Sequence, residues 1–152
     1  MKNLLHIVFL FLFMLPALAQ ENLSYQLPPK EILDLADYER APTVQLDTKK
    51  EWLLLSYRAT YKTLDDLNMD ELRLGGLRIN PKTNISSTLT YITNLKVRKV
   101  LGKNEIQVMG LPKNPKIANL YWSPDESKIA FSNTSDTGVE LWVLDIASAK
   151  AS

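Results

Sequence analysis

Acidic side chains gather in one stretch of this sequence and are the first candidates for chemistry. Asp65-Asp66 is followed closely by Asp70-Glu71, and grouped carboxylates are typical of glycoside hydrolysis and of calcium or magnesium binding. The alternative is a solvated helix face, because the helix dipole favours aspartate near a helix N-terminus. We favour the helix face, and we predict no catalytic residue, no cofactor and no metal site in this chain.

Two arginines, Arg73 and Arg78, flank Gly75-Gly76 in the same stretch. The planar guanidinium of arginine can bind a carboxylate with two parallel hydrogen bonds. Arg73 and Arg78 are therefore our candidate substrate-binding residues, for a carboxylate group of the substrate. The other interpretation is a structural pairing of both arginines with nearby acids.

The N-terminus has the pattern of a secretory signal. A positively charged start at Met1-Lys2-Asn3 leads into the apolar run Leu4–Leu15 and then into the small-x-small site Ala17-Leu18-Ala19. A membrane-spanning helix needs about 20 apolar residues, and this run is shorter. We predict that residues 1–19 are a cleaved signal peptide. The mature chain is then exported to the periplasm or outside the cell, with no membrane contact after cleavage.

Composition excludes several functions for the expected mature chain. The sequence has no cysteine, and its single histidine, His6, lies in the predicted signal peptide. A Ser-His-Asp triad needs a histidine as general base, so the mature chain cannot form one. The 18 Lys and Arg residues balance the 17 Asp and Glu residues once Lys2 is removed. We therefore expect no nucleic-acid partner, because phosphate backbones require a basic excess.

The residue pattern predicts two short helices followed by many short strands. Pro28-Pro29 and the apolar spacing after it indicate a helix over 29–37. Thr63 and Asp66 form a capping box for a second helix over 64–71. The strands bounded by turn residues are expected at 44–46, 52–57, 88–92, 96–101, 105–109, 118–122, 128–132 and 139–145. This spacing is typical of an all-β sandwich, barrel or propeller.

An internal repeat favours the propeller. Residues 44–56 align without gaps on residues 120–132, at an offset of 76, and each segment reads as strand, polar turn and apolar strand ending in serine. The second copy, Trp122-Ser-Pro-Asp125 with Lys128-Ile-Ala-Phe131, resembles the blade pattern of TolB-like propellers. Those repeats usually carry glycine where Glu126 stands, so the turn is expected to differ in detail.

The predicted fold class is mainly β, a partial β-propeller with TolB-like blades and two short helices. A blade has about 40–45 residues, so the offset of the repeat predicts an insertion near 58–92. Residues 20–43 are expected to be an extended segment with a short helix, and 44–152 the opening blades of an incomplete propeller. Because the smallest propellers have about four blades, we expect a truncated propeller. Two similar hairpins of a sandwich remain the alternative.

Three segments resemble one family: Tyr25–Asp37, Trp52–Leu55 and Asp70–Asn84. They are similar to secreted bacterial peptidases of the prolyl oligopeptidase family, the group related to plant chloroplast glutamyl endopeptidase. The stretch Glu-Leu-Arg-Leu-Gly-Gly-Leu-Arg-Ile-Asn-Pro, residues 71–81, is the most specific part of the resemblance.

The resemblance implies that a propeller precedes an α/β-hydrolase domain and restricts peptide access to its Ser-Asp-His triad. The implied partners are peptide substrates, some of them cut after glutamate, and they are reached through a catalytic domain absent from this chain. None of the family's catalytic positions falls here, and the glycines form no G-x-S-x-G elbow. The alternatives are a non-enzymatic secreted β-rich binding module and a degenerate gene product.

Overall fold

A computed structural model describes residues 26–152 of the chain. The predicted signal peptide lies outside these residues. The chain divides into two units, Met1–Ala36 and Asp37–Ser152, and each is described by itself.

The first unit contributes one short helix, α2 (Lys30–Ala36). It begins where Pro29 accepts hydrogen bonds from the amides of Ile32 and Leu33, at 3.0 and 3.1 Å, a position that suits proline because its missing N–H is not needed there. The helix predicted over 29–37 is confirmed to within one residue at each end. Within residues 26–152, no helix is long and apolar enough to cross a membrane.

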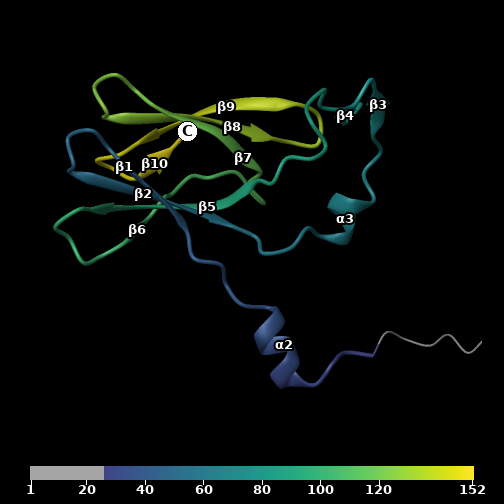
Figure 1. The fold of residues 1–152 in the computed structure, drawn as a ribbon. Helices are drawn as coiled ribbons and strands as arrows, with labels where there is room; N and C mark the ends of the chain where they lie inside the picture. The colour runs from purple at the N-terminus through teal and green to yellow at the C-terminus, as the bar shows by residue number, and fades with distance from the viewer. Residues whose placement is uncertain (1–25) are drawn as a thin grey trace, which may run out of the picture. The chain divides into compact units, whose positions relative to one another are not determined.

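The second unit is built from two four-stranded antiparallel meanders, which the pairing of Ile92 with Ile117 joins into one eight-stranded sheet. The first meander contains β1 (Thr43–Leu46), β2 (Trp52–Arg58), β5 (Ile92–Lys99) and β6 (Ile106–Gln107). The second meander contains β7 (Ile117–Trp122), β8 (Lys128–Thr134), β9 (Val139–Asp145) and β10 (Lys150–Ala151). In Figure 1, β8 and β9 form the upper layer and β2, β5 and β6 the lower one. The mainly β fold with two short helices is thus confirmed.

The hydrophobic core lies between the two meanders. Side chains from β2 and β5 meet side chains from β8 and β9, because alternate residues of a strand point to the same face of its sheet. All of the central ones have at most 1% of their surface exposed. They are Leu54, Leu95 and Val97 of the first meander and Ile129, Phe131 and Leu144 of the second.

The predicted repeat is a repeat of structure. Leu46 pairs with Leu53 in the β1–β2 hairpin, and Trp122 pairs with Ile129, at the same offset, in the β7–β8 hairpin. The turns also match, because Lys50 and Glu126 both adopt a left-handed backbone, with φ of 58° and 60°. That the turn at Glu126 differs in detail from the turn of TolB-like repeats stays a prediction; in this chain the glutamate takes the left-handed conformation for which glycine is ordinarily preferred.

Glu126 has a further role that explains its presence at a costly φ angle. Its carboxylate accepts hydrogen bonds from the Thr48 amide at 2.8 Å, the Thr48 hydroxyl at 2.6 Å and the Lys49 amide at 3.3 Å. The Lys49 ammonium donates in return to the Asp125 carbonyl at 2.7 Å. The turn of the second meander is therefore hydrogen-bonded to the equivalent turn of the first. A glycine in place of Glu126 has no side chain to make these bonds.

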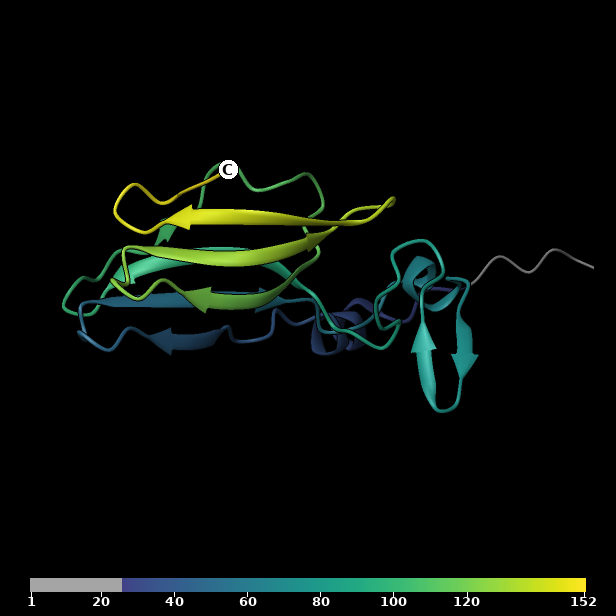
Figure 2. The same cartoon turned by 90° about the horizontal axis from the view of Figure 1, so that it is seen from above.

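The predicted insertion lies between β2 and β5. These strands are joined by residues 59–91, whereas β8 and β9 are joined by residues 135–138 alone. The insertion contains α3 (Leu64–Leu67) and a two-stranded hairpin of β3 (Leu72–Leu74) and β4 (Leu77–Ile79). Figure 2 shows this hairpin beyond one end of the strands of the meanders.

Two expectations inside the insertion were wrong. The second helix ends at Leu67 rather than at residue 71, although the capping box of Thr63 and Asp66 is present, because Glu71 is bound by the hairpin that follows. Residues 88–91 form no strand. There the Ser86 hydroxyl contacts the Thr88 hydroxyl at 2.8 Å and accepts from the Thr88 amide at 3.3 Å, and such local bonds compete with strand pairing.

Candidate functional site

The candidate site is built on the β3–β4 hairpin. Gly75 and Gly76 form its two-residue turn, with φ of 54° and 91°, values that only glycine adopts without strain and that match the twist of a tight hairpin. Arg73 then lies directly opposite Arg78. Because side chains alternate along a strand, the two arginines share one face of the hairpin. The other face carries the apolar side chains of Leu72, Leu74, Leu77 and Ile79.

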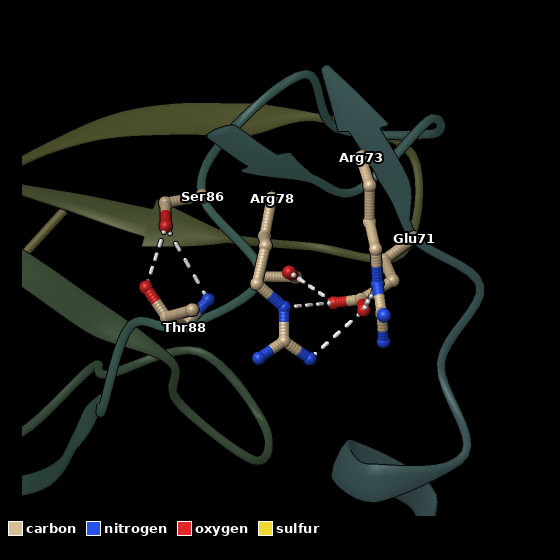
Figure 3. A network of polar contacts seen from close by, with 6 residues as sticks. Glu71, Arg73, Arg78, Ser86 and Thr88 are labelled. Atoms are coloured by element: carbon tan, nitrogen blue, oxygen red, sulfur yellow. Dashed lines mark hydrogen bonds and ion pairs between the residues drawn. The ribbon is translucent and has the colours of Figure 1, made fainter. Parts of the chain in front are cut away.

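Glu71 holds both arginines, as Figure 3 shows. Its carboxylate accepts from Arg73 Nε at 2.8 Å and from Arg78 through Nε and Nη2, both at 2.8 Å. The hydroxyl of Ser87 donates a further hydrogen bond at 2.9 Å. The Glu71 side chain is only 17% exposed, whereas those of Arg73 and Arg78 are 76% and 51% exposed.

These contacts set the charge of the cluster. The hydrogen bonds from Arg78, Arg73 and Ser87 lower the pKa of Glu71 from its ordinary 4.5 to about 2. The same contact with Glu71 raises the pKa of Arg78. Glu71 is therefore ionised near neutral pH, and the three side chains together carry one net positive charge.

The arginines keep hydrogen-bonding capacity for a ligand. A guanidinium has five N–H bonds, and Arg73 uses only Nε toward another residue of the described chain. Arg78 uses Nε and Nη2, so its Nη1 has no partner among residues 26–152. The cluster can accept an additional carboxylate from solvent, with Glu71 fixing the orientation of both guanidinium groups.

The segment after the hairpin positions Ser87. The Ser87 amide donates to the Arg78 carbonyl at 2.9 Å, and Ser86 pairs with Ile79 in an antiparallel bridge. Ser86 and Ser87 also line a cleft of about 430 Å³ between the insertion and the β7–β8 meander, together with Lys82 and Lys116. Most of the lining residues are of polar type, and Ser87 connects the cleft with the arginine cluster through its hydrogen bond to Glu71.

The acidic residues do not form a common site. Asp66 accepts from the Thr63 amide at 3.1 Å and the Thr63 hydroxyl at 2.8 Å, so it serves the helix cap. Glu71 is outside the helix and serves the arginines. Within residues 26–152 there is no group of three or more Asp, Glu, His or Cys side chains that could hold a metal ion.

The pairing of Arg73 and Arg78 with a nearby acid, the alternative in our sequence analysis, is thus present. Which acid it is was not predicted, since Glu71 was assigned to a helix face, and Ser87 was not considered. The spacing offers a signal. Glu71 stands two residues before Arg73, and residues two apart on a strand point to the same face. Arg78, directly opposite Arg73, shares that face. Whether the arginines bind a substrate stays a prediction.

Comparisons with known proteins give one consistent similarity. The chain is 31% identical over 146 residues to a protein of Oryza sativa subsp. japonica named "Probable glutamyl endopeptidase, chloroplastic". It is 29% identical over 137 residues to the protein of that name in Arabidopsis thaliana. These matches cover 88% and 84% of this chain but only 15% and 14% of the plant proteins. No family model and no solved structure matches. The chain is therefore similar to a small part of peptidase-named proteins.

Proposed function

We propose that this chain is the N-terminal β-propeller portion of an exported serine peptidase of the prolyl oligopeptidase family. The observation that carries the proposal is the repeated hairpin. The first hairpins of the two meanders share register beside the turn, and turn geometry, at an offset of 76 residues, as successive blades of a propeller do. The match that covers 88% of the chain, to the rice protein named "Probable glutamyl endopeptidase, chloroplastic", supports the same assignment.

In this proposal the chain contributes architecture, and the chemistry belongs to a catalytic α/β-hydrolase domain outside it. Its only histidine is His6, inside the predicted signal peptide, so the base of a Ser-His-Asp triad must come from elsewhere. The propeller portion would restrict access of peptides to that triad. The buried core between the two meanders suits such a gate.

Arg73 and Arg78 are the residues that we propose to contact the substrate. Their exposed donors and net positive charge fit a peptide carboxylate, and the names of the plant relatives refer to cleavage at glutamate. The test compares two peptides that differ only in glutamate or glutamine at the cleaved bond. We expect Arg73→Gln to lower kcat/KM about tenfold for the glutamate peptide alone, because a charge-assisted hydrogen bond contributes about 1.5 kcal/mol or more. The exposed Lys103→Gln is the control, and equal losses on both peptides would refute the role.

The size of the native product tests the proposed function itself. An immunoblot of the exported fraction uses antibody raised to residues 105–145, and the expected band is several times heavier than the 17.3 kDa of this chain. The same band should react with an activity-based probe for serine hydrolases. A band near the size of the mature chain would overturn the proposal and would favour a non-enzymatic secreted β-rich binding module.

A further inference from the structure

The cleft of about 430 Å³ between the insertion and the β7–β8 meander carries charges of both signs. Its cations are Lys82 and Lys116, and its acids are Asp70 and Asp136. Within residues 26–152, Lys82 and both of these acids take part in no ion pair. The Lys116 ammonium approaches one carboxylate, that of Asp66, at 3.8 Å, which is too long for a hydrogen bond. All four charged groups therefore remain available to a ligand.

Asn80 fixes the wall of the cleft that the insertion provides. The residue is only 9% exposed, and its side-chain carbonyl accepts from the Lys82 amide at 2.9 Å and from the Thr83 amide at 3.3 Å. Its backbone carbonyl accepts from the Asn84 amide at 2.8 Å. The turn that presents Lys82 to the cleft is therefore held in place by its own hydrogen bonds.

Asn133 fixes the opposite wall. This residue is 4% exposed, and its side chain accepts from the Lys116 amide at 3.0 Å and donates to the Glu140 carboxylate at 3.0 Å. The Lys116 carbonyl accepts in turn from the Thr134 amide at 2.9 Å. Both backbone groups of Lys116 are thus bound. A wall that is already ordered lowers the entropic cost of binding a ligand.

One buried hydroxyl in the cleft lacks a hydrogen-bond partner. The Thr83 hydroxyl oxygen is buried and has no partner among residues 26–152, and Thr83 lines the cleft. Buried polar groups are nearly always hydrogen-bonded, so an exception requires an explanation. A peptide group offers both an N–H donor and a carbonyl acceptor, and either one satisfies a hydroxyl.

The mixture of charges restricts the chemistry of the ligand. An inorganic anion would meet the carboxylates of Asp70 and Asp136, and a metal cation would meet the ammonium groups of Lys82 and Lys116. Like charges placed together disfavour binding. A neutral ligand would leave both signs of charge without a partner. A ligand with a positive end and a negative end pairs with both, and a short peptide with free termini has that pattern.

We propose that this cleft binds a short peptide through both of its free ends. The peptide ammonium pairs with the acids of the cleft and the peptide carboxylate with its lysines, while the Thr83 hydroxyl bonds to a peptide group between them. The site is distinct from Arg73 and Arg78, neither of which lines the cleft. The inference does not require the proposed function, because every group that it uses lies within residues 26–152.

Equilibrium dialysis of the native exported product against labelled trialanine tests the site. Serine-hydrolase activity is first blocked covalently, so that the probe is not cleaved. Trialanine is compared with its N-acetyl form, its C-terminal amide and free alanine. We expect each blocked form to bind about tenfold more weakly, because it loses one charge-assisted contact, and alanine to bind more weakly still, because it has no peptide group. Binding of a blocked form or of alanine as tight as that of trialanine would refute the proposal.

Two double variants assign the ends of the peptide. We expect Lys82→Gln with Lys116→Gln to weaken trialanine binding at least about tenfold and to leave binding of the amide, which has no carboxylate, unchanged. Asp70→Asn with Asp136→Asn should weaken trialanine by a similar factor and leave binding of the N-acetyl form, which has no ammonium, unchanged.

A matched control double variant changes one lysine and one aspartate outside the cleft. Lys103→Gln with Asp34→Asn alters two exposed side chains that do not line it, and we expect trialanine binding to stay at the parent level. The thermal midpoint of each variant is measured alongside, so that a loss of binding is not confused with unfolding. Parent-level binding of trialanine in both cleft variants would place the peptide elsewhere and overturn the proposal.

Discussion

Replacing Leu95 by alanine tests the central claim that the two meanders form one core. Leu95 lies in β5, has no exposed surface and belongs to the cluster shared by both meanders. Alanine removes three buried carbon groups, which lowers the free energy of unfolding by about 2.4 kcal/mol at about 0.8 kcal/mol for each. The cavity left behind raises the total to about 3–4 kcal/mol. That is a large part of the stability of an ordinary domain.

Pulse proteolysis of the native product in urea measures this loss region by region, with antibody to residues 105–145 as the detector. With an m-value of about 2 kcal/mol per molar urea, the midpoint falls by about 1.5–2 M. Leu101→Ala removes the same groups from a fully exposed side chain and is expected to shift the midpoint by less than about 0.3 M. If the two variants shift it equally, the packing of β5 against β8 and β9 is refuted.

Three further perturbations test the hydrogen bonds of Glu126, the hydrogen bonds of Glu71, and the close approach of Gly110 to Ala151. Glu126→Ala removes the carboxylate that binds the Thr48 amide, so hydrogen exchange at that amide is expected to accelerate, and unchanged exchange would refute the fastening of the turns. Because hydrogen bonds from Arg78, Arg73 and Ser87 lower the pKa of Glu71 to about 2, its contribution to stability is complete above its ordinary pKa of 4.5. That contribution is lost as pH falls from 4.5 toward 2, and NMR titration of the carboxyl carbon should show a midpoint near 2 rather than 4.5. Gly110→Ala would place a methyl group 2.5 Å from the Ala151 carbonyl oxygen, so β10 should detach and limited proteolysis of the C-terminal residues should become faster than in the parent protein.

Local patterns sufficed for much of the fold. The hairpins repeated at an offset of 76 are visible in the sequence because strand alternation and turn residues are short-range signals. The capping box of Thr63 and Asp66 and the tight turn at Gly75-Gly76 are equally local. The placement of the insertion was also predictable. The two matching segments lie 76 residues apart, and a blade has about 40–45 residues, so extra chain must lie between them.

The candidate site was only half predictable. The sequence identified Arg73 and Arg78, but it assigned Glu71 to a helix that the structure ends at Leu67. The competition between helix propensity and four charge-assisted hydrogen bonds to Glu71 is decided by residues as far along the chain as Ser87. The spacing of Glu71 and Arg73 alone does not resolve that competition.

By itself the sequence determined the composition, the absence of cysteine, the strand-rich pattern, the repeat and the pair of arginines around a glycine turn. Only the tertiary structure decided which faces are covered and which contacts join distant turns. Leu95 and Leu141 pair with the equivalent residues Ser56 and Ser132 of the repeat, yet one leucine is fully buried and the other is 80% exposed. Glu126 meets Thr48 across 78 positions of chain. Burial and long-range hydrogen bonds depend on which elements pack together, and that choice belongs to the assembled core rather than to any local run of residues.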